Sequence, residues 1–101
     1  MIEQNPTLTL NINHKIFDHS IVKDMVRIAY GGAIPRPCSG PTESVVTFYA
    51  HISDRTLYKA ITQIEELKAN VSTGHSATEL LDIHDAADYI IMMLTDIRYR
   101  K

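Results

Sequence analysis

The sequence predicts a small α+β domain with the element order β-α-β-α-α. Two short stretches alternate apolar and polar residues, which is typical of half-buried strands. Three longer stretches repeat apolar residues at steps of three and four, which is typical of amphipathic helices. The 101 residues are 45% hydrophobic, enough for one core. We therefore expect a single domain over 1–101, with residues 1–6 flexible because they precede the first pattern.

The alternating stretches at 8–16 and 45–52 predict the two strands. His14 falls on the apolar face of the first strand, where we expect it to find a backbone partner and not to serve as a ligand or catalyst. A sheet of two strands is thin, and its edges can pair with another copy of the chain. The strands are therefore expected to lean on the helices.

The first helix is expected between the strands, capped by Asp18 or Ser20 and reaching Ala29. The pair Gly31-Gly32 follows, and glycine is the residue that most readily leaves a helix in the left-handed conformation. Segment 31–44 holds three of the four prolines and three of the four glycines, so it predicts a long loop.

The second half of the chain predicts an antiparallel pair of helices. Asp54 is suited to cap the first of them, whose apolar stripe ends at Val71. Ser76 and Glu79 have the spacing of a capping box at the start of the last helix, which we expect to run over 76–101. The two strands and the short first helix are expected to pack on this hairpin.

The middle of the last helix is apolar on more than one side, beyond what one partner helix and a thin sheet easily cover. This width predicts a homo-oligomer in which the last helix contacts another subunit. The residues expected at that contact are Ile90, Ile91, Met93 and Leu94.

Charge and cysteine content exclude several classes of protein. The formal net charge is −2 and the basic residues are scattered, so general nucleic-acid binding is not expected. The helix expected at 18–30 has only Lys23 and Arg27 as bases, which disfavours sequence-specific DNA binding as well. Cys38 is the single cysteine, which excludes an internal disulfide and favours a reducing compartment, so we expect a cytoplasmic location. No apolar run is long enough for a membrane span, and no secretion leader is visible.

The acidic residues of the hairpin suggest one possible enzyme. Glu65 and Glu66 are adjacent on one helix, and Asp85 and Asp88 lie three apart on the next. In this arrangement the hairpin resembles the all-α nucleoside-triphosphate pyrophosphatases, the MazG-like family, although residue 69, where a further acid is usual, is alanine. The resemblance implies that these four acids hold magnesium and that the protein releases pyrophosphate from a nucleotide. Without a ligand, the same acids would form a solvated helix face, which is the interpretation we prefer.

Two further candidates are weaker. His84 and Asp88 have the spacing of a metal-ligand pair on one helix face, but no Cys-x-x-Cys or His-Glu-x-x-His motif accompanies them, which disfavours a structural zinc site. Cys38 lacks a base placed beside it in the sequence, so we interpret it as a free loop cysteine and not as a nucleophile.

The Gly/Pro-rich loop is the better candidate for a binding site. Arg36 stands between two prolines, and hydroxyl and backbone donors follow at Ser39, Gly40 and Thr42, a composition suited to a carboxylate or phosphate. Similar chemistry recurs at the chain end in Arg98, Tyr99 and Arg100. We therefore predict a non-enzymatic, oligomeric binding protein without a cofactor that recognises a protein partner or a small anionic ligand such as a nucleotide. The alternative is the magnesium-dependent hydrolase.

Overall fold

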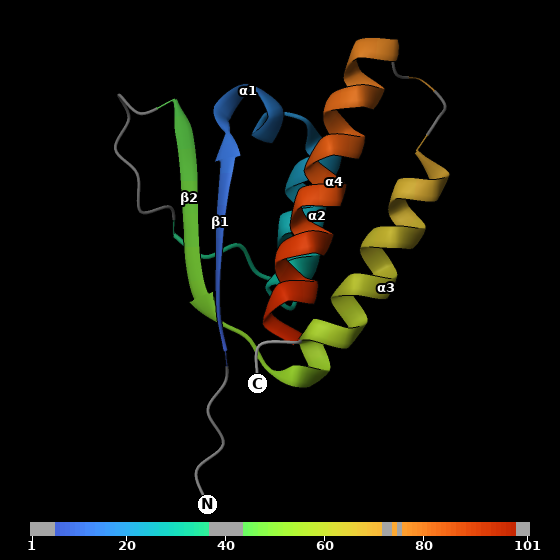
Figure 1. The fold of residues 1–101 in the computed structure, drawn as a ribbon. Helices are drawn as coiled ribbons and strands as arrows, with labels where there is room; N and C mark the ends of the chain where they lie inside the picture. The colour runs from blue at the N-terminus through green and yellow to red at the C-terminus, as the bar shows by residue number, and fades with distance from the viewer. Residues whose placement is uncertain (1–5, 37–43, 72–73, 75, 99–101) are drawn as a thin grey trace, which may run out of the picture.

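The structure is a computed structural model that describes residues 6–36, 44–71, 74 and 76–98. Figure 1 shows two strands side by side at one side of the molecule and the helices at the other. The predicted α+β class and the C-terminal helical hairpin are confirmed, and a short additional helix follows the first strand. In chain order the elements are β1 (Thr7–Asn13), α1 (His14–Phe17), α2 (Ser20–Ala29), β2 (Val45–His51), α3 (Asp54–Asn70) and α4 (Ala77–Arg98).

The two strands form an antiparallel sheet in which Leu10 lies opposite Phe48. The ladder continues past both strand ends, since Ile52 N–H donates to the carbonyl of Pro6 (2.9 Å) and His14 N–H to that of Ser44 (3.1 Å). The even-numbered residues of both strands therefore exchange the ladder hydrogen bonds, and the odd-numbered residues direct their backbone groups outward. The side chains that the sheet buries are Leu8, Leu10, Ile12, Val46 and Phe48.

The first strand is shorter than its alternating pattern predicts. Asn13 ends it because its side-chain oxygen accepts a hydrogen bond from Lys15 N–H (2.8 Å) and starts helix α1. His14 is consequently the first residue of α1 and not, as expected, part of the strand face. The turn places Phe17 against Phe48, with ring centroids 5.0 Å apart, so the apolar residues of this stretch still reach the core.

Helix α2 begins differently from the prediction and ends as predicted. Its N-cap is His19, with no side-chain cap hydrogen bond, so neither Asp18 nor Ser20 caps it. At its end Gly31 N–H donates to Ile28 (3.1 Å) and Gly32 N–H to Arg27 (2.8 Å), the two bonds of a Schellman motif. Both glycines have positive φ angles, +79° and +117°, which side chains other than glycine rarely adopt.

The hairpin starts with two side-chain caps. Ser53, one residue before the expected Asp54, accepts a hydrogen bond from Thr56 N–H (3.2 Å) at the start of α3. The capping box of α4 is confirmed, because Glu79 N–H donates to Ser76 Oγ (3.2 Å) and Ser76 N–H to Glu79 Oε1 (3.4 Å). Both helices bury an apolar stripe in the same core. The buried residues are Leu57, Ala60 and Ile64 in α3 and Ile83, Ala86, Ala87, Ile90, Leu94 and Ile97 in α4.

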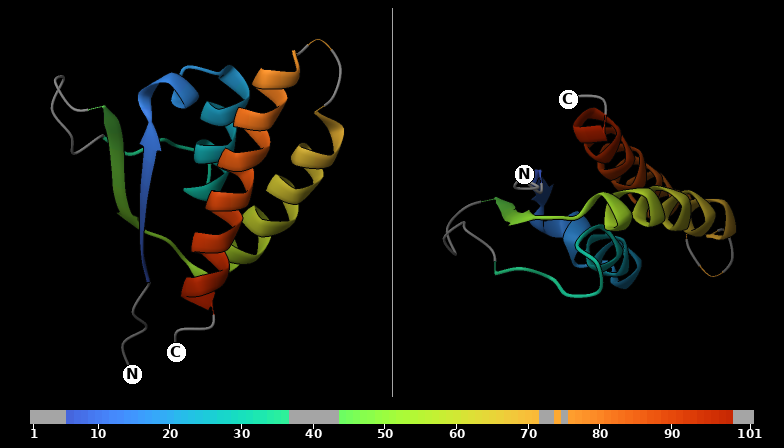
Figure 2. Two further views of the ribbon diagram at one scale, coloured as in Figure 1. Left: turned by 45° about the horizontal axis from the view of Figure 1, so that its top comes forward. Right: turned by 90° about the horizontal axis from the view of Figure 1, so that it is seen from below.

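Helix α4 lies along β1, and helix α3 lies on the side away from the sheet (Figures 1 and 2). The outward N–H of Asn11 in β1 donates to the Tyr89 hydroxyl of α4 (2.9 Å), which covers part of that sheet edge. This packing corrects the prediction that Ile90 and Leu94 lie at a subunit contact. Both are 0% exposed within the single chain, so they are core residues. Of the predicted contact set, Ile91 and Met93 are partly buried and still reach the surface. In the described part of the chain, no helix has the length and apolar character that crossing a membrane requires.

Candidate functional site

Only part of the predicted binding loop lies within the described residues. Arg36 is exposed. Ser39, Gly40 and Thr42 lie outside the described residues, and so does Cys38. At the chain end Arg98 is described, and Tyr99 and Arg100 are not.

The described beginning of the loop lines a cavity of about 350 Å³ between α2 and α3. Among the described residues that line it, three are cationic, Arg27 from α2 and Arg55 and Lys59 from α3, and none is acidic. We call this cavity the basic pocket. Its lining residues are Arg27, Ile28, Gly31, Gly32, Arg55, Thr56, Lys59 and Gln63.

The glycine turn determines how closely the two walls of the basic pocket approach. A Cβ atom at Gly31 would lie 3.3 Å from Thr56 Cγ2, so the turn passes directly over the first turn of α3. Thr56 is itself held by Ser53, whose hydroxyl lies 2.9 Å from the Thr56 hydroxyl. Two local motifs, the Schellman turn and the Ser53 cap, thus build one end of the pocket.

The charges of the basic pocket are largely uncompensated. Arg27 contacts Asp24 (3.0 Å), but both side chains are about half exposed, and such pairs contribute little. Among the described residues neither Arg55 nor Lys59 forms an ion pair. The residues at the start of α3 also lie at the positive end of that helix's dipole. An anion is the species that this set of groups can hold.

The sequence contains a signal for the two cations of α3, although the predicted binding site does not include them. Arg55, Lys59 and Gln63 are spaced four residues apart, which places them on one face of a helix with no acid among them. The position of Arg27 opposite this face depends on how α2 packs on α3, and the spacing of residues along the chain does not specify it.

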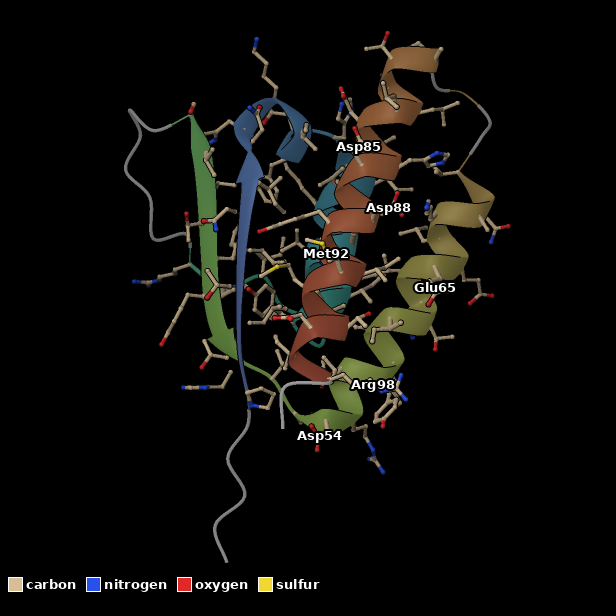
Figure 3. The ribbon with its side chains drawn as sticks, viewed as in Figure 1. Asp54, Glu65, Asp85, Asp88, Met92 and Arg98 are labelled. Carbon is tan, nitrogen blue, oxygen red and sulfur yellow. The ribbon has the colours of Figure 1, made fainter. Side chains whose placement is uncertain are left out.

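Arg98, the described residue of the predicted second patch, does not join the basic pocket. Its guanidinium carbon lies 4.3 Å from the ring centroid of Tyr58, on the side of α3 that meets α4. In Figure 3 Arg98 lies at the end of α4, beside the first turn of α3. The pocket lies instead between α3 and α2, so Arg98 is separate from the basic pocket.

The four acids of the hydrolase alternative are also divided. Glu65 and Asp88 line a second cavity, of about 560 Å³, between α3 and α4. Asp85 lines a different cavity, of about 120 Å³, together with residues of β1. Figure 3 agrees with this division: Asp88 lies on the α3 side of α4, and Asp85 does not. Glu66 is exposed and lines none of these cavities.

The described residues do not form the metal site that the resemblance implies. In residues 6–36, 44–71, 74 and 76–98, no three His, Cys, Asp or Glu side chains are grouped so that they could hold a metal ion. Asp88 instead pairs with Lys68, which stands one helical turn from Glu65 on α3. His84 and Asp88 line the same cavity without a third ligand.

Comparison of the chain with protein-family models, with curated proteins and with solved structures found no significant match.

Proposed function

We propose that this chain is a non-enzymatic binding protein that holds a small phosphorylated ligand, such as a nucleotide, in the basic pocket. The observation that carries the proposal is the convergence of Arg27, Arg55 and Lys59 on a cavity of about 350 Å³ whose described lining contains no acid. Pockets of roughly 300–1,000 Å³ are typical for small ligands. The concave shape favours a small ligand over a protein partner.

The donors of the pocket match a phosphate group in number and kind. Two guanidinium groups can each donate paired hydrogen bonds to phosphate oxygens, and the Lys59 ammonium adds a third charge. Thr56 contributes a hydroxyl at the start of α3, where the helix dipole also favours an anion. Three cations suit a phosphate carrying two or more charges better than a single carboxylate. Ile28 offers an apolar surface for the remainder of the ligand.

The loop residues named from the sequence extend this proposal. Gly31 and Gly32 belong to the pocket, whereas the predicted residue Arg36, four residues after Gly32, is exposed and does not line it. We expect Ser39, Gly40 and Thr42 to take part in binding as well, and this part stays a prediction because they lie outside the described residues. Arg98, Tyr99 and Arg100 would form a separate patch. The single cysteine supports a reducing, cytoplasmic location as part of the same proposal.

The proposal includes self-association of the chain. The outer edge of β2 supports it more than the surface of α4 does. Helix α4 covers part of the outer edge of β1, whereas the outward N–H of Tyr49 in β2 has no hydrogen bond among the described residues. Such an edge can pair with the same edge of a second copy and form a four-stranded sheet. Ile91 and Met93 would belong to the contact between two copies only if α4 also lies at that contact.

Titration calorimetry with ATP, AMP and inorganic phosphate in the presence of a chelator tests the ligand. We expect binding without metal, and Arg55→Ala or Lys59→Ala should weaken it about tenfold or more, since a hydrogen bond to a charged group contributes roughly 1.5–3 kcal/mol. Lys15→Ala, which removes an exposed lysine of α1 outside the pocket, is the matched control and should leave the affinity unchanged.

Two outcomes would contradict the proposal. Equal affinity in the parent protein and in both pocket variants would show that the ligand binds elsewhere. Binding that requires magnesium and is followed by release of pyrophosphate would support the hydrolase, and loss of that activity in Asp88→Asn would place it on the hairpin.

A further inference from the structure

The larger cavity, between α3 and α4, is separate from the basic pocket and shares no residue with it. It measures about 560 Å³, within the range that small organic ligands occupy. We call it the hairpin pocket. It is lined by Glu65, Lys68, Ala69, Val71, His84, Asp88 and Ile91.

The polar wall of the hairpin pocket has an excess of negative charge. Lys68 pairs with Asp88 across the two helices, which uses the only ammonium group among the described residues of the lining. Glu65 has no ion-pair or hydrogen-bond partner among the described residues. A ligand with one positive charge would therefore balance the pocket, and one with a negative charge would be repelled.

A second polar group of the wall lacks a partner. Nε2 of His84 is buried and has no hydrogen bond among the described residues. An unsatisfied buried nitrogen is unfavourable, and the imidazole can turn about its Cβ–Cγ bond, whose torsion is broad. His84 lines the cavity, so a donor on a ligand could satisfy this nitrogen if the ring turns so that Nε2 becomes accessible.

The rest of the lining is apolar. Ala69 and Val71 come from the end of α3 and the residue after it, and Ile91 comes from α4. Val71 is 6% exposed, so this wall belongs to the edge of the core. It suits a hydrocarbon or aromatic body more than a second charged group.

We propose that the hairpin pocket binds a small organic amine, with its ammonium group between Glu65 and His84 and its apolar body against Val71 and Ile91. The charge balance, the unpartnered histidine nitrogen and the apolar wall together select this class of ligand. The inference is independent of the phosphate site, because the two pockets have different walls and opposite charge.

Three compounds of matched shape test the inference: phenethylamine, 2-phenylethanol and 3-phenylpropanoate, titrated while the amide signals of the labelled protein are followed by NMR. We expect the amine to shift the signals of His84 and Ile91 in a saturable manner. The alcohol should bind at least about tenfold more weakly, because it lacks the charge that Glu65 compensates, and the anion should not bind.

A pair of adjacent variants separates the site from a general attraction to acidic protein. Glu65→Gln should weaken amine binding about tenfold. Glu66→Gln removes the same charge from a neighbour that is also exposed but does not line the pocket, so it should leave amine binding unchanged. Equal effects of the two variants, equal binding of amine and alcohol, or no shift with the amine would each overturn the inference. Arg55→Ala should not affect amine binding, so this test and that of the phosphate site can fail separately.

Discussion

Single residues at the helix ends show how local the signals in this sequence are. The Ser76–Glu79 capping box forms as its spacing predicts, since both partners lie within one helical turn. At α2 the cap is His19, although Asp18 and Ser20 on either side are better caps by residue type. The sequence placed this helix end within a residue or two, and the path of the chain out of α1 decided which residue occupies the cap.

Alanine substitutions at two serines test this difference. Ser76→Ala should lower the free energy of unfolding by about 0.5–2 kcal/mol, because it removes the oxygen that accepts Glu79 N–H. Ser20→Ala changes an exposed first-turn serine that does not cap, so we expect a change within about 0.5 kcal/mol. Urea denaturation of both variants measures this, and similar losses would contradict the assignment of the α2 cap to His19.

At the scale of elements, the apolar period of α4 predicted its buried face correctly but not the partner of that face. Ile90 and Leu94 fall on the predicted stripe, and that stripe is covered by the chain's own helices and sheet. The acids of the same helix show that residues close in sequence can have different neighbours. Asp85 and Asp88 are only three residues apart, yet they line different cavities because β1 lies beside one face of α4 and α3 beside another.

Core and surface positions of α4 should therefore respond differently to truncation. Leu94→Ala should destabilise the protein by about 2–5 kcal/mol, since Leu94 is 0% exposed and the substitution leaves a cavity. Met92→Ala should change stability by no more than about 0.5 kcal/mol, because Met92 is 58% exposed. Thermal unfolding monitored by circular dichroism compares them. A large loss of stability in Met92→Ala would contradict this expectation and would indicate that another subunit covers α4.

At the scale of the whole molecule, the two strands form a sheet that has a long helix beside only one of its edges, that of β1. Tyr89 of α4 closes part of the β1 edge through its hydrogen bond to Asn11. No helix makes a comparable contact with β2 except the short α1. The outer edge of β2 is therefore where the described part of the chain most resembles half of a larger sheet.

Light scattering at tens of micromolar protein tests the oligomer, and we expect at least a dimer. Tyr49→Pro should shift the mass toward the monomer, because proline removes an N–H that points away from β1 while the β1–β2 ladder keeps its bonds. Tyr49→Ala shortens the same side chain but keeps the N–H, so it serves as the control and should stay oligomeric. A monomer mass for the parent protein would contradict self-association.

The sequence by itself determined the α+β class, the helical hairpin, the capping box and the glycine turn, because periodicity, caps and left-handed glycines act within a few residues. The tertiary structure alone decided which side chains meet. It brought Arg27 to Arg55 and Lys59, separated Asp85 from Asp88 and buried Ile90. The physical reason is that the period of an element fixes which residues share a face, whereas the element that covers the face depends on the packing of the whole chain.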